Sequence, residues 1–332
     1  MTETRFLTSE DVSGLATPAD YVSAVRDGYR QVGEGAPAEP RTRLDSADPP
    51  GFLSNYVAIL PDTGVMGGYT YAAGFGDRDA HFVTSLFDAG SGRPLAIVDG
   101  ASTNPFKTGA AGAVGVDELA RADAGTVGVI GSGPQARGQL RATATVRDLD
   151  AVRVFSPTRE HRESFAASMD DHLDAAVEPV ADAAGAVEGA DVVITATTAT
   201  EPVFDGDLLA PGTHVTAMGQ YSPGKRELDH RTIQRATYVP DLRARAFQDA
   251  GSFLSALEAG VVDEDHVHAE LGEVVAGVEP GRTRDDEVTV FDSGGTGIET
   301  VAAANLLYER AVEADRGTTV EFFPASEALT GE

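Results

Sequence analysis

Several residue types that usually reveal a protein's chemistry are scarce in this chain of 332 residues. It contains no cysteine, which excludes a disulfide framework and thiolate chemistry. No apolar run approaches the roughly 20 residues that a transmembrane helix needs. The segment from Met1 to Arg5 lacks the basic and apolar regions of a secretory signal. We therefore expect a cytoplasmic protein.

Positive charge is also scarce. Lysine and arginine together number 25 against 53 aspartates and glutamates, which gives a net charge of −28, and the only lysines are Lys107 and Lys225. The acidic residues are spread along the chain rather than gathered in one block. Such a charge opposes compaction unless salt screens it, so we expect a halophilic protein. It disfavours nucleic acids and anionic membranes as partners.

The seven histidines are scattered, and only His266 and His268 lie close together. Residues two positions apart do not share a helix face. The sequence therefore predicts no metal site.

A strand, a glycine-rich turn and a helix are predicted in the middle of the chain. The β-branched run that starts at Thr126 leads into Gly131-Ser132-Gly133, and Ala136 opens a helix-forming stretch. In a dinucleotide-binding βαβ unit, the first glycine makes the turn and the second lets the backbone approach the pyrophosphate. The third small residue lets helix and strand pack closely, and the helix N-terminus offers N–H groups to the phosphates. This context favours a dinucleotide site over a purely structural turn.

The residues after the second predicted strand bear on the choice of cofactor. An NAD site usually carries Asp or Glu about 20 residues beyond the glycines, whereas NADP sites tend to use Arg. Here Ser156 occupies the acidic position, and Thr158 and Arg159 follow. Two hydroxyls and a guanidinium suit a 2′-phosphate. A Ser-Pro turn that caps the next helix also explains Ser156 and Thr158, and the two roles are compatible. We expect NADP(H) rather than NAD(H).

The pattern of apolar runs changes along the chain. Up to about residue 115 it indicates a mixed α+β region with an amphipathic helix at 20–32, a polar, proline-rich segment at 34–50 and an antiparallel sheet. From residue 126 strands and helices alternate, which is typical of a doubly wound parallel sheet with its ligand at the carboxyl ends of the strands. The antiparallel strands are predicted at 55–60, 65–72, 81–87 and 94–98, and the parallel ones at 126–130, 151–155, 177–180, 191–197, 213–218, 237–240 and 288–291.

Short motifs follow one another in order along nearly the whole chain. They are Gly92-Arg93-Pro94-Leu95-Ala96, Lys107-Thr108-Gly109-Ala110-Ala111, 129–136, Ala190-Asp191-Val192-Val193, 223–229 and Phe291-Asp292-Ser293-Gly294-Gly295. Together they resemble the ornithine cyclodeaminase/μ-crystallin family, which also includes archaeal alanine dehydrogenases and ketimine reductases. The Pro-Gly-Lys-x-Glu-Leu sequence that begins at Pro223 is the most diagnostic of them.

The resemblance implies an α/β fold in which a Rossmann-type domain is inserted into an α+β substrate domain. We expect residues 1–117 with 308–332 to form the substrate-binding and dimerisation domain, and 118–307 the NAD(P)-binding domain. Pairing of substrate domains would give a homodimer. Members of the family move hydride between a nicotinamide and the α-carbon of an amino or imino acid. In the cyclodeaminase the cofactor is reduced and reoxidised within one turnover, and ammonia is released.

The residues that the resemblance places against the substrate depart from the family pattern. Tyr69 stands in the place of a lysine, Lys107 in that of the arginine that grips the carboxylate, and Tyr221 in that of an acidic residue. Lysine keeps the charge of arginine but loses its bidentate geometry. The two tyrosines remove one positive and one negative charge. A dibasic substrate such as ornithine thereby loses its expected partner.

Four residues are candidates for the chemistry. Lys107 can hold a carboxylate, with Arg41 after Pro40 as a second anchor. Tyr69 and Tyr221 can donate a proton to an imine nitrogen or a carbonyl oxygen, or can merely line the pocket or the dimer interface. The expected cofactor-binding residues are Thr108, Gly131, Gly133, Pro134, Gln135, Ala136, Ser156, Thr158, Arg159, Thr197, Met218, Gly219, Lys225 and Ser293, the last two by resemblance near the nicotinamide.

The leading hypothesis is an NAD(P)-dependent oxidoreductase that acts on a small amino, imino or keto acid. One alternative is a cyclodeaminase that releases ammonia without net cofactor turnover. Another is a catalytically idle NADP(H)-binding protein, as in the lens crystallins that resemble this family.

Overall fold

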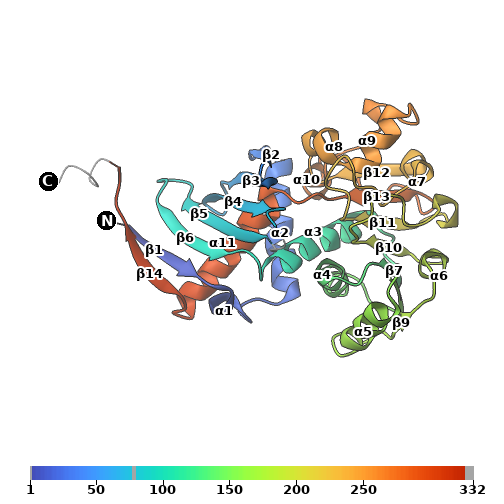
Figure 1. Ribbon diagram of the computed structural model, residues 1–332, viewed down its shortest axis with the longest axis horizontal. Helices are drawn as coiled ribbons and strands as arrows, with labels where there is room; N and C mark the ends of the chain where they lie inside the picture. Colours follow the sequence, from blue (N-terminus) through green and yellow to red (C-terminus); the bar gives the residue numbers. More distant parts are fainter. Residues whose placement is uncertain (1, 77–79, 326–332) are drawn as a thin grey trace. The chain divides into compact units, whose positions relative to one another are not determined.

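The computed structural model describes residues 2–76 and 80–325, which form two compact units (Figure 1). The terminal unit combines the two ends of the chain, up to Asn104 and from Thr296 onward, and the central unit is Pro105–Gly295. The boundaries expected at 117/118 and 307/308 fall inside helices α3 (Asn104–Leu119) and α11 (Gly297–Glu313). Because each helix is continuous, the units divide near its first turn instead.

The described strands of the terminal unit form one seven-stranded sheet in the order β14-β1-β6-β5-β4-β3-β2. Neighbours are antiparallel except β1 and β6, which confirms the antiparallel run predicted between residues 55 and 98. The elements are β1 (Thr2–Leu7), α1 (Ser9–Val12), α2 (Pro18–Gly33), β2 (Ala38–Ala47), β3 (Pro50–Leu60), β4 (Val65–Ala73), β5 (His81–Asp88), β6 (Pro94–Asp99), α11 and β14 (Thr318–Phe322).

Helices α2 and α11 pack together, and α11 lies against strands β2 to β6 (Figure 1). A capping box between Thr17 and Asp20 starts α2. Gly28 permits the close approach of α11, because a Cβ at this position would lie 3.2 Å from the Ile298 side chain. The two helices thus bury the inner face of the sheet.

Strand β2 was not expected, since its segment is polar and rich in proline. It is an edge strand that pairs with β3, and an edge position tolerates both its polar side chains and Pro40. The register shifts between Glu39 and Thr42, around Arg41. A bulge of this kind redirects a side chain, and Arg41 is buried there.

The described strands of the central unit form a seven-stranded, all-parallel sheet in the order β12-β13-β11-β10-β7-β8-β9, which confirms the doubly wound fold. Its strand order reverses between β7 and β10. Besides α3, the elements are β7 (Thr126–Ile130), α4 (Pro134–Thr143), β8 (Ala151–Phe155), α5 (Arg159–Asp170), β9 (Val177–Pro179), α6 (Ala183–Val187), β10 (Val192–Thr195), η1 (Gly206–Leu208), β11 (His214–Ala217), α7 (His230–Arg235), β12 (Ala236–Pro240), α8 (Arg243–Asp249), α9 (Gly251–Glu258), η2 (Glu264–His266), α10 (Leu271–Val275) and β13 (Val288–Asp292).

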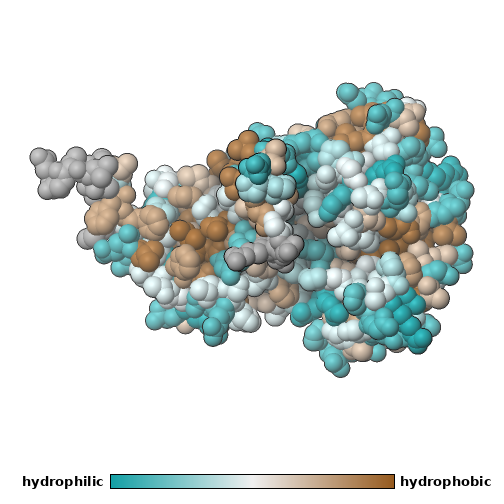
Figure 2. Space-filling view, in the orientation of Figure 1, coloured by the Kyte–Doolittle hydropathy of each residue, from teal (hydrophilic) through white to brown (hydrophobic). Residues whose placement is uncertain are grey.

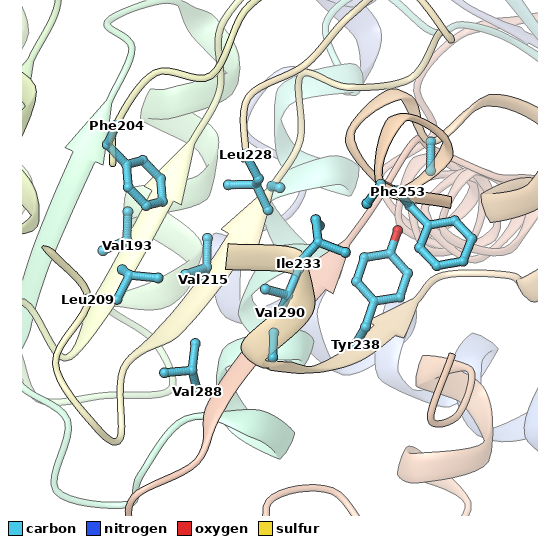
Figure 3. Close-up of a cluster of buried hydrophobic side chains, with 14 of the residues drawn as sticks. Val193, Phe204, Leu209, Val215, Leu228, Ile233, Tyr238, Phe253, Val288 and Val290 are labelled. Carbon is cyan, nitrogen blue, oxygen red and sulfur yellow. The ribbon is translucent and has the colours of Figure 1, made fainter. Parts of the chain in front are cut away.

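Both faces of the parallel sheet are apolar, as a sheet covered by helices on both sides requires. On one face Val193, Val215 and Val290 pack with Ile233 and Phe253 (Figure 3). On the other face, residues of β7, β8 and β10 such as Val129, Val154 and Ile194 pack with Leu140 of α4 and Phe165 of α5. Packing on both faces of the sheet therefore holds the carboxyl ends of the strands in place. No helix within residues 2–76 and 80–325 has the length and apolar character to span a bilayer.

The glycines of the segment that follows Lys107 are explained by helix packing. A Cβ at Gly109 would lie 2.4 Å from the carbonyl oxygen of Gly138 in α4, and one at Gly138 would lie 2.1 Å from that of Pro105. Neither position has room for a side chain. Helices α3 and α4 therefore touch through their backbones, which brings Lys107 and Thr108 close to the glycine turn.

His214 makes the central unit sensitive to acid. It is fully buried in β11, where its ring nitrogens bond Thr289 and Thr216. Burial, followed by the charges of Arg282 and Arg147, lowers its pKa from 6.5 to about 3.

Between these two pKa values the unfolded chain binds the proton and the folded chain does not. Stability is therefore lost as the pH falls below 6.5, by about 1.4 kcal/mol per pH unit from this group. We expect His214→Gln to show a shallower loss of unfolding free energy from pH 6.5 to 4.5, measured by urea denaturation at constant salt. Equal slopes for both proteins would exclude His214 as the cause.

Candidate cofactor and active site

A cavity of about 680 Å³ opens at the carboxyl ends of β7, β8, β10 and β11 in the central unit, at the reversal of strand order. This is where open parallel sheets bind ligands, and the volume is typical of a ligand site. Of the predicted residues, Gly131, Gly133, Pro134, Gln135, Ser156, Thr158, Thr197, Met218, Gly219 and Tyr221 line it. None of the residues that line it is acidic.

The glycine turn has the form that a pyrophosphate site requires. Gly131 has a φ of +121°, and a Cβ there would lie 2.4 Å from the carbonyl oxygen of Ala196. At Gly133, the N-cap of α4, a Cβ would meet nothing within 4 Å, and no side chain caps the helix. The start of this helix therefore has room beside Gly133 and no side-chain cap, which fits a bound phosphate. Ala136 is buried beneath the turn, where a small residue lets helix and strand approach.

The ribose end of the cavity, beyond β8, is built from hydroxyl groups. Ser132 donates a hydrogen bond to the hydroxyl of Ser156 (3.1 Å), which in turn donates to the carbonyl oxygen of Thr158 (3.3 Å). Thr158 is the N-cap of α5 but makes no capping bond with its side chain. The Thr158 hydroxyl therefore does not cap α5. Ser156 and Thr158 do form the predicted turn, because the Ser156 hydroxyl bonds the Thr158 backbone.

Arg159 does not line this cavity. Its side chain is 73% exposed and pairs with Glu163 at 2.7 Å. His161, two residues further on, does line it. Sequence reasoning missed His161, because only the first turn of α5 as formed shows which residue faces the strand ends.

The N-terminal part of α3 is joined to the glycine turn by hydrogen bonds. Thr108 donates from its hydroxyl to the side-chain oxygen of Gln135, and Gln139 donates to the backbone oxygen of Thr108 (2.6 Å). Lys107 precedes Thr108 and is only 3% exposed. Lys107, the only cation of the motif at 107–111, is therefore buried next to Thr108, which bonds Gln135 at the start of α4.

Tyr221 and Lys225 form a pair beside the cavity. The Lys225 ammonium donates a hydrogen bond to the Tyr221 hydroxyl (2.8 Å) and lies 4.1 Å from the centre of its ring. Tyr221 itself lines the cavity. A cation at a phenol oxygen stabilises the phenolate that remains after proton donation. The geometry therefore suits Tyr221 as a proton donor and Lys225 as its positioning residue.

A buried ionic network lies beneath the ends of β12 and β13. Arg245 is fully buried and bonds the carboxylates of Asp241 (2.7 Å) and Asp292 (2.8 Å). Asp292 also accepts hydrogen bonds from Tyr238 and Gln220. Ser293 is buried and donates to Asp241 (3.3 Å) rather than lining the cavity.

In the terminal unit, Arg41 and Tyr69 belong to an aromatic cluster on the inner face of the sheet. The Arg41 guanidinium lies 4.9 Å from the ring centre of Tyr56, which stacks on Tyr69 with 5.6 Å between ring centres. Burial, with smaller contributions from Tyr71 and Glu299, raises the pKa of Tyr69 above its usual value, against the opposing charge of Arg41. A raised pKa makes Tyr69 a poorer proton donor than a solvated phenol.

Residues 2–315 match the ornithine cyclodeaminase/mu-crystallin family. The chain belongs to this family. It is 33% identical to an alanine dehydrogenase of Archaeoglobus fulgidus, over 97% of this chain and 99% of the relative. Its fold is similar to that of the Thermococcus litoralis Δ1-pyrroline-2-carboxylate reductase solved with NADH and L-proline, with a TM-score of 0.90, 32% identity and coverage of 96% of this chain and 100% of the other. An archaeal alanine dehydrogenase dimer with bound NAD gives a TM-score of 0.90 at 31% identity, over 97% and 100% of the two chains.

The resemblance to the ornithine cyclodeaminase/mu-crystallin family is therefore confirmed, and the two similar solved structures hold NADH and NAD. The family motifs take up distinct positions in the central unit. The segment that begins at Lys107 packs on α4, the segment from Pro223 leads to the buried Glu227, and Asp292 belongs to the ionic network.

Removal of Arg245 should destabilise the central unit strongly. Arg245→Met leaves Asp241 and Asp292 buried without their cation, so we expect a loss of about 3–5 kcal/mol in unfolding free energy. Chemical denaturation at neutral pH and fixed salt measures it. The control is Arg231→Met, which breaks the exposed pair with Asp207 and should cost less than about 1 kcal/mol. Similar losses in both variants would contradict this view of the network.

Proposed function

We propose that this protein is an NAD(P)-dependent oxidoreductase that transfers hydride at the α-carbon of a small amino or imino acid. The observation that carries the proposal is the Tyr221–Lys225 pair at the edge of a cavity with a dinucleotide-type glycine turn. Similarity over almost the full chain to an alanine dehydrogenase and a Δ1-pyrroline-2-carboxylate reductase supports it.

The candidate residues of the central unit have distinct roles in this proposal. A bound nicotinamide dinucleotide supplies or accepts the hydride. Lys107 holds the substrate carboxylate as a point charge. In the reductive direction Tyr221 gives its proton to the imine nitrogen, and Lys225 stabilises the phenolate until it is reprotonated. The roles of Arg41 and Tyr69 stay predictions from the family resemblance.

Tyr221 disfavours the cyclodeaminase alternative. A dibasic amino acid carries a second ammonium group, which needs an anionic partner. Tyr221 takes the place of the carboxylate that the family resemblance implies, and a phenol does not supply that charge. We therefore favour net reduction or oxidation of a substrate with one amino or imino group.

NADP(H) is the cofactor that we propose. The ribose end offers the hydroxyls of Ser156 and Thr158, the uncapped start of α5 and His161, with no carboxylate to repel a 2′-phosphate. Arg159 can join them only if it leaves Glu163. The absence of acidic residues from this cavity stands out in a chain with a net charge of −28.

A homodimer in concentrated salt is the working form that we propose. On the outer face of the terminal sheet, Leu53, Val57, Ile59 and Val83 are exposed, and hydrophobic atoms gather on this unit in Figure 2. A hollow of about 600 Å³ lies on the same face, with Met66 and Phe87 among its lining residues. A second copy of the chain would cover this face, consistent with the dimeric alanine dehydrogenase.

NADPH oxidation tests the proposed activity. The purified protein is assayed in concentrated KCl with cyclic imino acids and with keto acids plus ammonium or amines. We expect turnover with one substrate class, a fall of about 10²–10⁴-fold in kcat for Tyr221→Phe, and a higher KM for Lys107→Ala. Binding of NADPH without turnover across the panel would favour the idle cofactor-binding protein. Ammonia release without net NADPH change would favour the cyclodeaminase.

A second test addresses the choice of cofactor. Ser156→Asp places a carboxylate where a 2′-phosphate would bind, and like charges repel. We expect the ratio of NADH to NADPH affinity to rise by at least about tenfold, or 1.4 kcal/mol, as measured by cofactor fluorescence titration. Arg159→Ala, titrated in parallel, shows whether the guanidinium leaves Glu163 to contribute. An unchanged ratio in Ser156→Asp would overturn the NADP(H) assignment.

A further inference from the structure

Glu227 is a fully buried carboxylate that joins the ends of two strands. Its Oε1 accepts hydrogen bonds from the backbone N–H (2.6 Å) and the hydroxyl (2.7 Å) of Thr197. Its Oε2 accepts from the hydroxyl of Thr195 (2.8 Å) and the backbone N–H of Gly219 (2.7 Å). Thr195 is the last residue of β10, Thr197 lies two residues beyond it, and Gly219 follows β11. One side chain thus sets the spacing between the two strand ends.

The carboxylate is held by hydrogen bonds alone, since no ion pair to Glu227 occurs among the residues that the structure describes. Burial raises the pKa of the Glu227 carboxyl, and the hydrogen bonds from Thr197, Thr195 and Gly219 oppose that rise. The space is tight, because a Cβ at Gly219 would lie 2.4 Å from Oε1 of Glu227. A buried charge is costly to keep in place unless every lone pair is satisfied.

The segments that Glu227 joins are walls of the cofactor cavity. Thr197 and Gly219 both line it, as do their neighbours Ala196 and Met218. They lie on the side of β10 and β11, whereas Ser156 and His161 lie on the side of β8. In a doubly wound dinucleotide site each half of the sheet holds one mononucleotide, and the ribose-binding position after the second strand marks the adenosine half. The half that Glu227 organises is therefore the nicotinamide half.

Glu227 also anchors one end of the loop that carries Tyr221, the proposed proton donor. The backbone N–H groups of Glu227 (3.2 Å) and Leu228 (3.1 Å) both donate to the hydroxyl of Ser252. The loop from Gly219 to Glu227, which contains Tyr221 and Lys225, is thus fixed at both ends. Its geometry depends on the carboxylate that bonds its first residue.

We propose that Glu227 is a positioning residue for the nicotinamide half of the cofactor. Its carboxylate holds the ends of β10 and β11 at the separation that this half requires. The adenosine half is bound by the glycine turn and Ser156 instead. The inference rests on the proposed use of a nicotinamide dinucleotide.

Glu227→Gln tests the proposal, because each carboxylate oxygen accepts one backbone N–H, which cannot rotate away. In either orientation the amide NH₂ group of glutamine faces such a donor, so the two strand ends must separate. We expect the Kd for NADPH and NADH to rise at least tenfold, while the Kd for ADP-ribose and 2′,5′-ADP changes less than twofold. Titration calorimetry gives all four values without turnover.

Two further variants complete the experiment. Glu287→Gln alters a buried carboxylate that bonds Thr283 just before β13, at the amino ends of the strands and so away from the cavity, and should leave all four affinities unchanged. Thr195→Val removes one hydroxyl donor and should weaken dinucleotide binding in the same selective way, so that it replaces Glu227→Gln if that variant does not fold.

The outcomes separate the two proposals. Equal weakening of dinucleotides and of ADP-ribose, or no weakening, would overturn the role of Glu227. If the wild-type protein binds ADP-ribose but gains no affinity from the nicotinamide half, the proposed function fails as well. Selective loss in Glu227→Gln with an unaltered Glu287→Gln supports the assignment whatever the substrate.

Discussion

The cofactor cavity depends on how the carboxyl ends of the parallel strands are closed. At these ends the backbone leaves the sheet, and its N–H groups lose their strand partners, so each needs another acceptor. Buried carboxylates supply them. Glu227 accepts from the backbone at the ends of β10 and β11, and Asp241 accepts from the N–H of Gly294 after β13 (2.8 Å). The shape of the cavity therefore depends on the buried carboxylates that hold the strand ends in place.

These carboxylates are tolerated for different reasons. Asp241 and Asp292 share the charge of Arg245, so their burial is compensated within an ion network. Glu227 accepts hydrogen bonds from dipolar groups alone among the described residues. The acidic composition of the chain therefore does not extend into the cavity, where the lining residues include no acid and where phosphate oxygens need room without repulsion. The net charge of the chain therefore does not predict the charge of the residues that line the cavity.

Much of this arrangement could be predicted from the sequence. The glycine turn, the parallel strands and the family followed from short patterns whose geometry is local. Strand β2 could not be predicted, because an edge strand with polar residues on both sides carries no alternation. Arg159 and His161 could not be told apart, since the choice depends on which residue of the first turn of α5 faces the strands. Glu227 stood in a recognised motif, but its partners Thr195 and Thr197 are about 30 residues away in sequence and meet it only across the sheet.

The proposed proton donor and the proposed positioning residue for the cofactor share one loop in this protein. Tyr221 and Lys225 lie between Gly219 and Glu227, so a substitution that moves this loop moves both the Tyr221 hydroxyl and the cavity wall at Gly219. Arg41 and Tyr69 pack within the terminal unit, in the aromatic cluster around Tyr56. The hydrogen bonds of Glu227 lie within the central unit. The contacts described for the loop from Gly219 to Glu227 therefore come from the central unit, where the strand ends that the carboxylate joins also line the cavity.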